Sequence, residues 1–269
     1  NVAMRGKYIL YRGIGEDGIP FRRREEFSPT MFVPSQKETK YKTLDGFYME
    51  PIQPGNIPDT REFVNKYQNI KGFDVYGNTD FVYQFIGKNY KGEIDYDFSQ
   101  IKVAYIDIEC ESEHGFPRPD NPNEKINAIT VDFNGWVYVF GLGKFNLPNQ
   151  DKLRQFQFDT EEELLESFIS TWELESPDIV TGWNVRFFDV PYLVNRITKV
   201  LGESEAKRLS PWKFLKERNV RKMNRENQTY EISGIATLDY YELYQTFTYI
   251  NQESYRLDHI AFVEVGEKK

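Results

Sequence analysis

Two acidic residues, Asp107 and Glu109, stand two positions apart near the middle of the chain. They alternate with apolar residues in the run 105–110, which has the pattern of a half-buried β-strand. Side chains two residues apart on a strand share one face, so the two carboxylates should lie side by side. Like charges at this spacing are unfavourable without a cation, and oxygen ligands are what Mg²⁺ or Mn²⁺ takes from proteins. The pair therefore indicates a metal-dependent phosphoryl-transfer site, with the solvated face of an edge strand as the alternative.

A third acidic residue, Asp189, follows about eighty residues later in the segment 178–192. That segment begins with β-prone residues, is interrupted at Gly182, and places Pro191 in the first turn of a helix that we expect to end near Gly202. Asp189 should thus lie at the start of the helix. An Asp there is commonly an N-cap worth about 1 kcal/mol, which is the alternative to a role as metal ligand.

The two segments together resemble the first two exonuclease motifs of the family B DNA polymerases. An Asp-Ile-Glu strand is followed by Gly-Trp-Asn-Val-x-x-Phe-Asp-x-Pro-Tyr, in the same order as in that family. The detailed similarity is to the replicative polymerases of T-even-like bacteriophages and covers essentially the whole chain. It continues through five further runs, which are 114–117, 202–211, 238–240, 251–258 and 265–269.

This resemblance implies an α/β fold in two domains. Residues 1–99 would form a small α+β N-terminal domain, and residues 100–269 an RNase H-like, mixed-sheet 3′–5′ exonuclease domain. Four acidic residues bind two divalent metals in such enzymes, and Asp107, Glu109 and Asp189 match three of them. The implied activity is hydrolysis of the 3′-terminal phosphodiester of single-stranded DNA, assisted by two Mg²⁺ or Mn²⁺ ions. An RNase H-like nuclease of another specificity would share the fold but should lack the second motif.

The fourth ligand of the family, an Asp in a Tyr-x-x-x-Asp motif, has no match after Asp189. Tyr249 with Glu253 has the spacing but the wrong acid, and Tyr255 with Asp258 is one residue short. Nothing matches the polymerase palm motifs either. We therefore expect the chain to be a fragment that stops before the third exonuclease motif and cannot synthesise DNA alone. The alternative function is a non-catalytic nucleic-acid-binding fragment that needs the missing polymerase half.

A basic stretch offers one set of candidate nucleic-acid contacts. It contains eight cationic residues interrupted by a single acidic one, and they are Lys207, Arg208, Lys213, Lys216, Arg218, Arg221, Lys222 and Arg225. Phosphate contacts supply most non-specific affinity for nucleic acid, so this local excess matters more than the net charge of −8. In the resembling polymerases this stretch holds a β-hairpin that helps to separate primer from template. We assign that hairpin to residues 218–233, with Arg218, Arg221 and Lys222 as DNA contacts and a solvated loop as the alternative.

Aromatic and amide side chains beside the two motifs form a second set. Phe116, Asn184 and Phe188 match family positions beside the scissile nucleotide, where stacking and backbone contacts hold a frayed 3′ end. Lys269 matches a family lysine near the same site. The alternatives are a core role for each phenylalanine and satisfaction of turn backbone groups by Asn184.

Composition bounds the remaining possibilities. With 269 residues, 39% of them hydrophobic and 16% aromatic, the chain can build two cores. One Cys excludes an internal disulfide, and two His residues far apart argue against zinc and a His-based triad. No apolar run has the length of a membrane span, so we expect a cytoplasmic protein of a phage-infected bacterium. Its expected partners are a single-stranded 3′ end, primer-template DNA, the rest of the polymerase and, through that part, a sliding clamp.

Local signals predict three further features of the second domain. Asn134-Gly135 between apolar runs predicts a hairpin turn. Thr160 with Glu163 predicts a capping box, and we interpret the acidic run 161–163 as a complement to the helix dipole. Asp239 precedes apolar periodicity and is expected to be structural.

Overall fold

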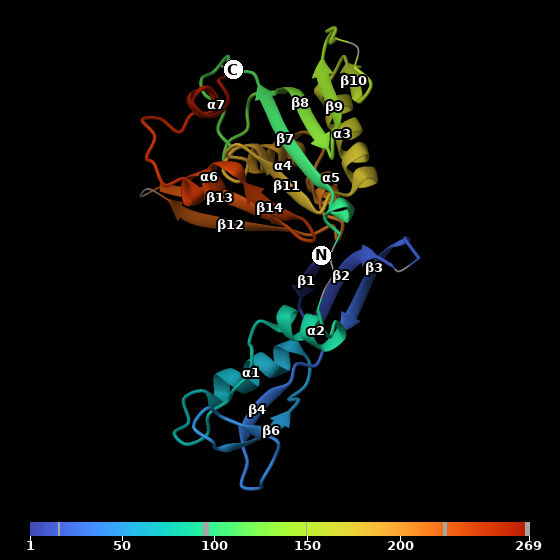
Figure 1. Ribbon diagram of the computed structural model, residues 1–269. Helices are drawn as coiled ribbons and strands as arrows, with labels where there is room; N and C mark the ends of the chain where they lie inside the picture. The colour runs from blue at the N-terminus through green and yellow to red at the C-terminus, as the bar shows by residue number, and fades with distance from the viewer. Residues whose placement is uncertain (16, 94–96, 149, 223–224, 267–269) are drawn as a thin grey trace. The chain divides into compact units, whose positions relative to one another are not determined.

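The computed structural model describes residues 1–15, 17–93, 97–148, 150–222 and 225–266 (Figure 1). The chain forms two compact units, Asn1–Asp97 and Phe98–Lys269. The division lies two residues before the 99/100 boundary expected from the sequence. Each unit has its own hydrophobic core, and each is described by itself.

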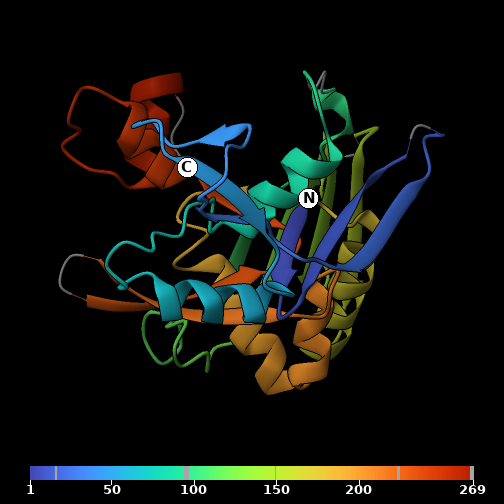
Figure 2. The same cartoon turned by 90° about the horizontal axis from the view of Figure 1, so that it is seen from below.

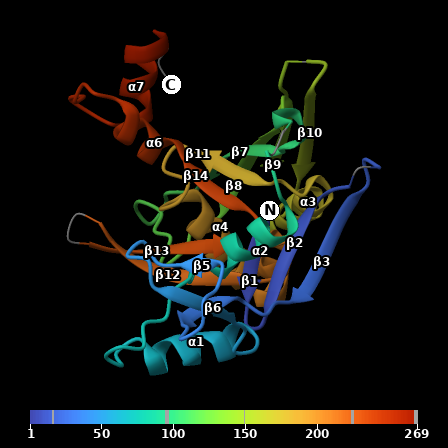
Figure 3. The ribbon, with the colours of Figure 1, turned by 60° about the horizontal axis from the view of Figure 1, so that its bottom comes forward.

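The first unit contains two small antiparallel sheets and two helices. Its elements are β1 (Val2–Arg5), β2 (Tyr8–Ile14), β3 (Pro20–Glu26), β4 (Met31–Pro34), β5 (Tyr41–Lys42), β6 (Tyr48–Ile52), α1 (Ile57–Tyr67) and α2 (Phe81–Asn89). The sheet orders are β1-β2-β3 and β4-β6-β5, and β2 with β3 forms a long hairpin drawn in blue (Figure 2, Figure 3). Ile9, Met31, Phe81 and Phe85 are almost fully buried in its core.

The second unit is built on a six-stranded mixed sheet. Its strands are β7 (Val103–Cys110), β8 (Ile126–Phe133), β9 (Trp136–Leu142), β10 (Leu153–Phe158), β11 (Ile179–Gly182) and β14 (Ala236–Asp239). They are ordered β10-β9-β8-β7-β11-β14. The β7-β8 and β8-β9 pairs are antiparallel, whereas β9-β10, β7-β11 and β11-β14 are parallel. The carboxylate strand β7 is therefore an interior strand of the sheet, which overturns the alternative of an edge strand.

Helices and one separate hairpin complete the second unit. They are η1 (Phe98–Gln100), α3 (Glu161–Glu175), α4 (Asp189–Val200), α5 (Glu203–Ala206), η2 (Lys207–Leu209), the hairpin strands β12 (Leu215–Lys222) and β13 (Arg225–Ile232), α6 (Tyr240–Phe247) and α7 (Leu257–Val265). Helix α3 packs on β8, β9 and β10, while α4 packs on β7 and on the hairpin strand β13. The antiparallel β12–β13 pair confirms the hairpin expected in this stretch, with its first strand beginning three residues earlier.

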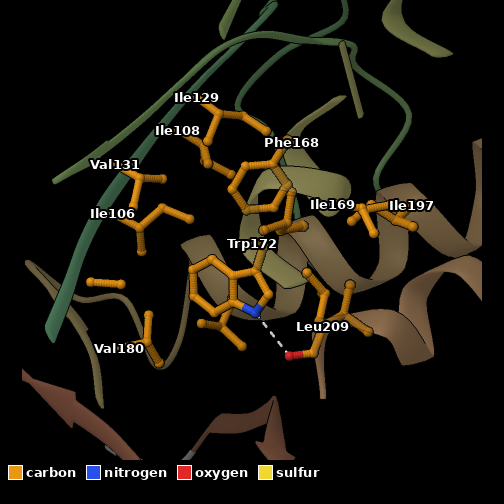
Figure 4. Packing of buried hydrophobic residues seen from close by; sticks show 14 of the residues in the cluster. Ile106, Ile108, Ile129, Val131, Phe168, Ile169, Trp172, Val180, Ile197 and Leu209 are labelled. Atoms are coloured by element: carbon orange, nitrogen blue, oxygen red, sulfur yellow. Dashed lines mark hydrogen bonds between the residues drawn. The ribbon is translucent and has the colours of Figure 1, made fainter. Parts of the chain in front are cut away.

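The core of the second unit lies between the sheet and its helices (Figure 4). Ile106 and Ile108 point from β7 toward Phe168 and Trp172 of α3, and each of these side chains is at most 5% exposed. The Trp172 indole N–H donates to the carbonyl of Leu209 at 2.9 Å, so its polar edge is satisfied inside the core. Because side chains alternate along a strand, burying Ile106 and Ile108 directs Asp107 and Glu109 to the opposite face.

Two turns show why particular residues are needed. Asn134 and Gly135 both have positive φ, at 51° and 89°, as a two-residue type I′ hairpin between β8 and β9 requires. Gly182 ends β11 at a point of close approach, because a β-carbon there would lie 2.5 Å from the carbonyl oxygen of Ile106. The absence of a side chain thus lets β11 lie against β7 directly beside Asp107.

Candidate active site

The three predicted metal ligands come from β7 and from the start of α4. Asp107 and Glu109 are exposed on one face of β7. Asp189 is the first residue of α4 and is 4% exposed. Its Oδ1 accepts a hydrogen bond from the backbone N–H of Ile108 at 3.1 Å. The second acidic motif therefore reaches the backbone of β7 between the two acidic residues of the first.

Asp189 does not cap its own helix. The N-cap of α4 is Phe188, and no side-chain cap hydrogen bond is present. The structure thus excludes an N-cap role for Asp189, which was the structural alternative for this residue. The buried Asp189 carboxylate instead makes its one described hydrogen bond to another element, which is β7.

Electrostatics link Asp189 to Asp107. Burial, and next the nearby negative charge of Asp107, together raise the pKa of Asp189 to about 7, although the hydrogen bond from Ile108 N–H opposes the shift. Two carboxylates that disfavour each other's ionisation form an oxygen-donor pair that a hard divalent cation would neutralise. Within the part of the chain that the structure describes, however, no group of three or more acidic, His or Cys side chains converges as a metal-binding cluster. Glu109 shares the exposed face of β7 with Asp107.

A fourth carboxylate, Asp239, holds the turn between β11 and α4. It is 3% exposed and accepts hydrogen bonds from the backbone N–H groups of Asn184 at 3.1 Å and Arg186 at 2.9 Å. It also caps α6 by accepting from Tyr241 N–H at 2.9 Å. This turn includes Asn184 with a φ of 63°, a left-handed conformation that Asn tolerates. Asp239 is therefore structural, as expected, and its role is to position the second motif.

A cleft of about 870 Å³ opens beside this turn. It brings together three residues predicted from the family resemblance, Phe116, Asn184 and Phe188. The Phe116 ring is 83% exposed and lies 5.9 Å from the Phe188 ring, which stacks in turn on Tyr192. Phe116 therefore lies outside the core, whereas Phe188 is partly buried and packs against it. The cleft is not lined by the three acidic residues Asp107, Glu109 and Asp189. Its lining includes Phe188, which directly precedes Asp189 in the sequence.

The cleft is also lined by aromatic residues that the sequence did not single out. Trp183 contacts Tyr241 edge-on at 5.5 Å and also lies against Tyr240 and Tyr244. Tyr255 contacts Tyr241 and, like Trp183 and Tyr241, lines the cleft. The available signal was the tyrosine spacing in 240–244, which places several rings on one helix next to the Trp of the second motif.

The predicted basic contacts are partly neutralised within the chain. Arg218 pairs with Glu231 across the hairpin at 2.5 Å, Lys207 with Glu203, and Arg208 with both Glu173 and Glu205. Arg221 is exposed on β12 opposite Glu226. The backbone of Lys222 lies at the end of β12, opposite Arg225. Lys269 lies outside the described residues.

A buried ion pair between α3 and α4 was not predicted. Glu161 receives two hydrogen bonds from Arg196, at 2.6 and 2.8 Å, and both side chains are at most 8% exposed. Its Oε1 also accepts from Ile126 N–H at 2.9 Å. The interpretation of this residue as a helix-dipole complement was therefore incomplete, because Glu161 joins α3, α4 and β8. Thr160 caps α3 by accepting from Glu163 N–H at 3.3 Å, which confirms one half of the predicted capping box; the reciprocal bond is not found among the described residues.

Comparison with known proteins agrees with this architecture. The family described as "DNA polymerase family B, exonuclease domain" matches residues 55–260, which include both acidic motifs, the cleft and the hairpin. The chain belongs to this family. The RNase H-like character of family B exonuclease domains matches the mixed α/β sheet observed here, so the resemblance and the fold class expected from the sequence are confirmed.

Relatives of this family B chain include phage and herpesvirus polymerases. The DNA-directed DNA polymerase of Escherichia phage RB69 is 33% identical over 98% of this chain and 32% of its own length. That of Enterobacteria phage T4 is 32% identical with the same coverage. The DNA polymerase catalytic subunit of Alcelaphine herpesvirus 1 is 26% identical over 66% of this chain. The chain thus spans about a third of the length of its phage relatives.

Across the described residues, no helix combines the length and apolarity needed to cross a membrane.

Proposed function

We propose that this chain carries a 3′–5′ exonuclease that removes nucleotides from single-stranded 3′ ends of DNA. Asp107, Glu109 and Asp189 would hold Mg²⁺ or Mn²⁺, and the aromatic cleft would hold the strand. In the proofreading role that this implies, the rest of a polymerase would supply DNA synthesis and primer-template binding.

The observation that carries the proposal is the meeting of the two acidic motifs. Asp189 reaches Ile108 N–H at 3.1 Å, and the charge of Asp107 raises its pKa. A protein gains no stability by placing an ionisable group in this position, since burial and a like charge both oppose its ionisation. Such strongly perturbed carboxylates beside a cleft are typical of catalytic sites.

Each element has a distinct task in this proposal. The carboxylate oxygens would hold the cations, and bound divalent ions supply activation of water and stabilisation of the leaving 3′ oxygen. Phe116 and Phe188 would stack on bases at the 3′ end, because stacking tolerates any base. Exposed Arg221 would contribute a phosphate contact on the hairpin. The chain itself needs no nucleophile for this chemistry.

The test uses single-stranded DNA labelled at either end, with Mg²⁺ or Mn²⁺. Stepwise shortening of 5′-labelled DNA and early release of a labelled mononucleotide from 3′-labelled DNA would demonstrate the direction. We expect Asp107→Ala and Asp189→Ala to lower the rate by at least about a hundredfold, as loss of a metal ligand should. Glu162→Ala is the matched control, because it removes an exposed acidic side chain on α3. Equal degradation by the parent and both variants would instead indicate a contaminating nuclease and contradict the proposal.

One observation favours a second function, which is binding of single-stranded DNA without hydrolysis. The described residues contain no ready three-ligand cluster, although the aromatic cleft is fully formed. Binding by the parent in EDTA, together with no hydrolysis under any metal condition, would support this second function. Absence of both binding and hydrolysis would contradict the two proposals together.

A further inference from the structure

Two segments far apart in sequence both line the cleft. The loop after β7 contributes Phe116 to Asp120, and the β12–β13 hairpin contributes Glu226 to Gln228. The separation of these two segments must determine how closely the cleft fits a DNA strand. Neither segment belongs to the six-stranded sheet, so their relative position needs another source.

Asn195 of α4 makes a hydrogen bond to each of these segments. Its side-chain Nδ2 donates to the carbonyl of Pro119 at 2.7 Å and to Oε1 of Gln228 at 2.8 Å. Its Oδ1 accepts from the hydroxyl of Tyr230 at 2.6 Å. Gln228 Nε2 donates in turn to the Tyr230 hydroxyl at 3.2 Å, which closes a ring of three side chains. We call Asn195, Gln228 and Tyr230 the amide ring.

The amide ring fixes the orientation of Asn195. A backbone carbonyl can only accept, so the Asn195 amino group must face Pro119. Burial raises the pKa of Tyr230, which keeps its phenol protonated and able to donate at neutral pH. Both amide hydrogens and the amide oxygen of Asn195 are therefore used, and no other side chain type of this size offers two donors and one acceptor in this arrangement.

We propose that Asn195 is a positioning residue for DNA, setting the distance between the loop after β7 and the hairpin. This inference rests on the proposed function, because it assigns the cleft to a single strand. Asn195 does not line the cleft, so it would act through Pro119 and Gln228, both of which do. Its neighbours on α4 support the loop from the same side, since Tyr192 and Arg196 donate to the carbonyls of Glu124 and Asn123.

The test compares Asn195→Ala, Asn195→Leu and the control Thr198→Ala. Thr198 is on the same helix, is exposed, and its hydroxyl donates to the helix carbonyl of Val194. Binding of a fluorescent single-stranded oligonucleotide is measured by anisotropy in EDTA, and single-turnover hydrolysis is measured as a function of DNA concentration with Mn²⁺. We expect both Asn195 variants to weaken binding and raise the half-saturating DNA concentration by about tenfold, as loss of two or three hydrogen bonds predicts. The rate at saturating DNA should change less than about threefold.

Leucine separates hydrogen bonding from the presence of a side chain, since it keeps the branched four-atom outline of Asn but can neither donate nor accept. Parent-like binding by Asn195→Leu, or a fall only in the saturated rate, would overturn the inference. If Asn195→Ala proves unstable, Tyr230→Phe tests the same ring by removing one hydroxyl, and unchanged binding there overturns it equally. A parent that binds no single-stranded DNA would refute the proposed function itself. Normal binding by both the parent and the Asn195 variants would refute only the positioning role.

Discussion

The starts of α4 and α6 each contain a buried aspartate, but the two residues are used in opposite ways. Asp239 satisfies three backbone N–H groups and caps its helix. Asp189 does not cap its helix and accepts one described hydrogen bond from another element. Burial and the charge of Asp107 both raise its pKa. Burial of a carboxylate therefore does not identify its role. The hydrogen-bond donors and like charges around the carboxylate decide it.

The largest effect should come from Asp239→Ala. It would leave three backbone N–H groups without their acceptor in a buried turn, at roughly 1–3 kcal/mol for each group that water cannot reach. We expect the free energy of unfolding to fall by about 3–5 kcal/mol. Chemical denaturation followed by circular dichroism measures this change. A loss below about 1 kcal/mol would show that the turn is held by other contacts.

Asp189→Asn should act in the opposite direction when divalent metal is absent. Because the folded-state pKa of Asp189 is raised to about 7, the parent loses stability as the pH rises from about 4 through 7. Asn is neutral and keeps an acceptor for Ile108 N–H. At pH 8 in EDTA we expect the variant to be more stable by about 2–4 kcal/mol, with the difference vanishing near pH 4. Equal stability at both pH values would contradict this assignment of Asp189.

Added Mn²⁺ should reduce that advantage. Saturating ion binds the folded parent and should stabilise it by about 1–3 kcal/mol, whereas Asp107→Asn and Asp189→Asn should gain much less. Denaturation curves with and without Mn²⁺ provide the measurement, and Glu162→Gln is the control for general charge effects. A gain of the same size in all four proteins would place the ion elsewhere.

The smallest effect should come from Glu242→Gln, which removes an ion pair from the turn that Asp239 holds. Arg186 and Glu242 pair at 2.9 Å, with side chains 39% and 31% exposed. Partly exposed pairs contribute little, so we expect less than about 1 kcal/mol, and less still in high salt. A larger loss would mean that the ion pair, rather than Asp239, anchors this turn.

Local patterns allowed several of these features to be predicted. The alternation around Asp107 gave a strand, Asn134-Gly135 gave a hairpin turn, and the periodicity after Pro191 gave α4, now bounded as Asp189–Val200. The strand, the turn and the helix can each be predicted from residues that are neighbours in the sequence. The family resemblance then supplied Phe116, Asn184 and Phe188, which the fold gathers in one cleft.

Features that depend on how elements pack could not be predicted. The amide ring joins residues more than thirty positions apart, and no periodicity marks Asn195 for it. Glu161 resembled any acidic residue in a first helical turn until α4 placed Arg196 beside it. Arg218 resembled a free cation because its partner Glu231 lies on the other strand of the hairpin. Sequence patterns report the environment of a residue along its own element, whereas these partners belong to another.

The close approach at Gly182 limits which substitutions this domain can accept. An added methyl group would meet the Ile106 carbonyl oxygen at 2.5 Å, so even the mildest substitution must separate two neighbouring strands. Those strands lead into the two halves of the proposed catalytic centre. A side chain at this position should therefore displace the two acidic halves relative to each other.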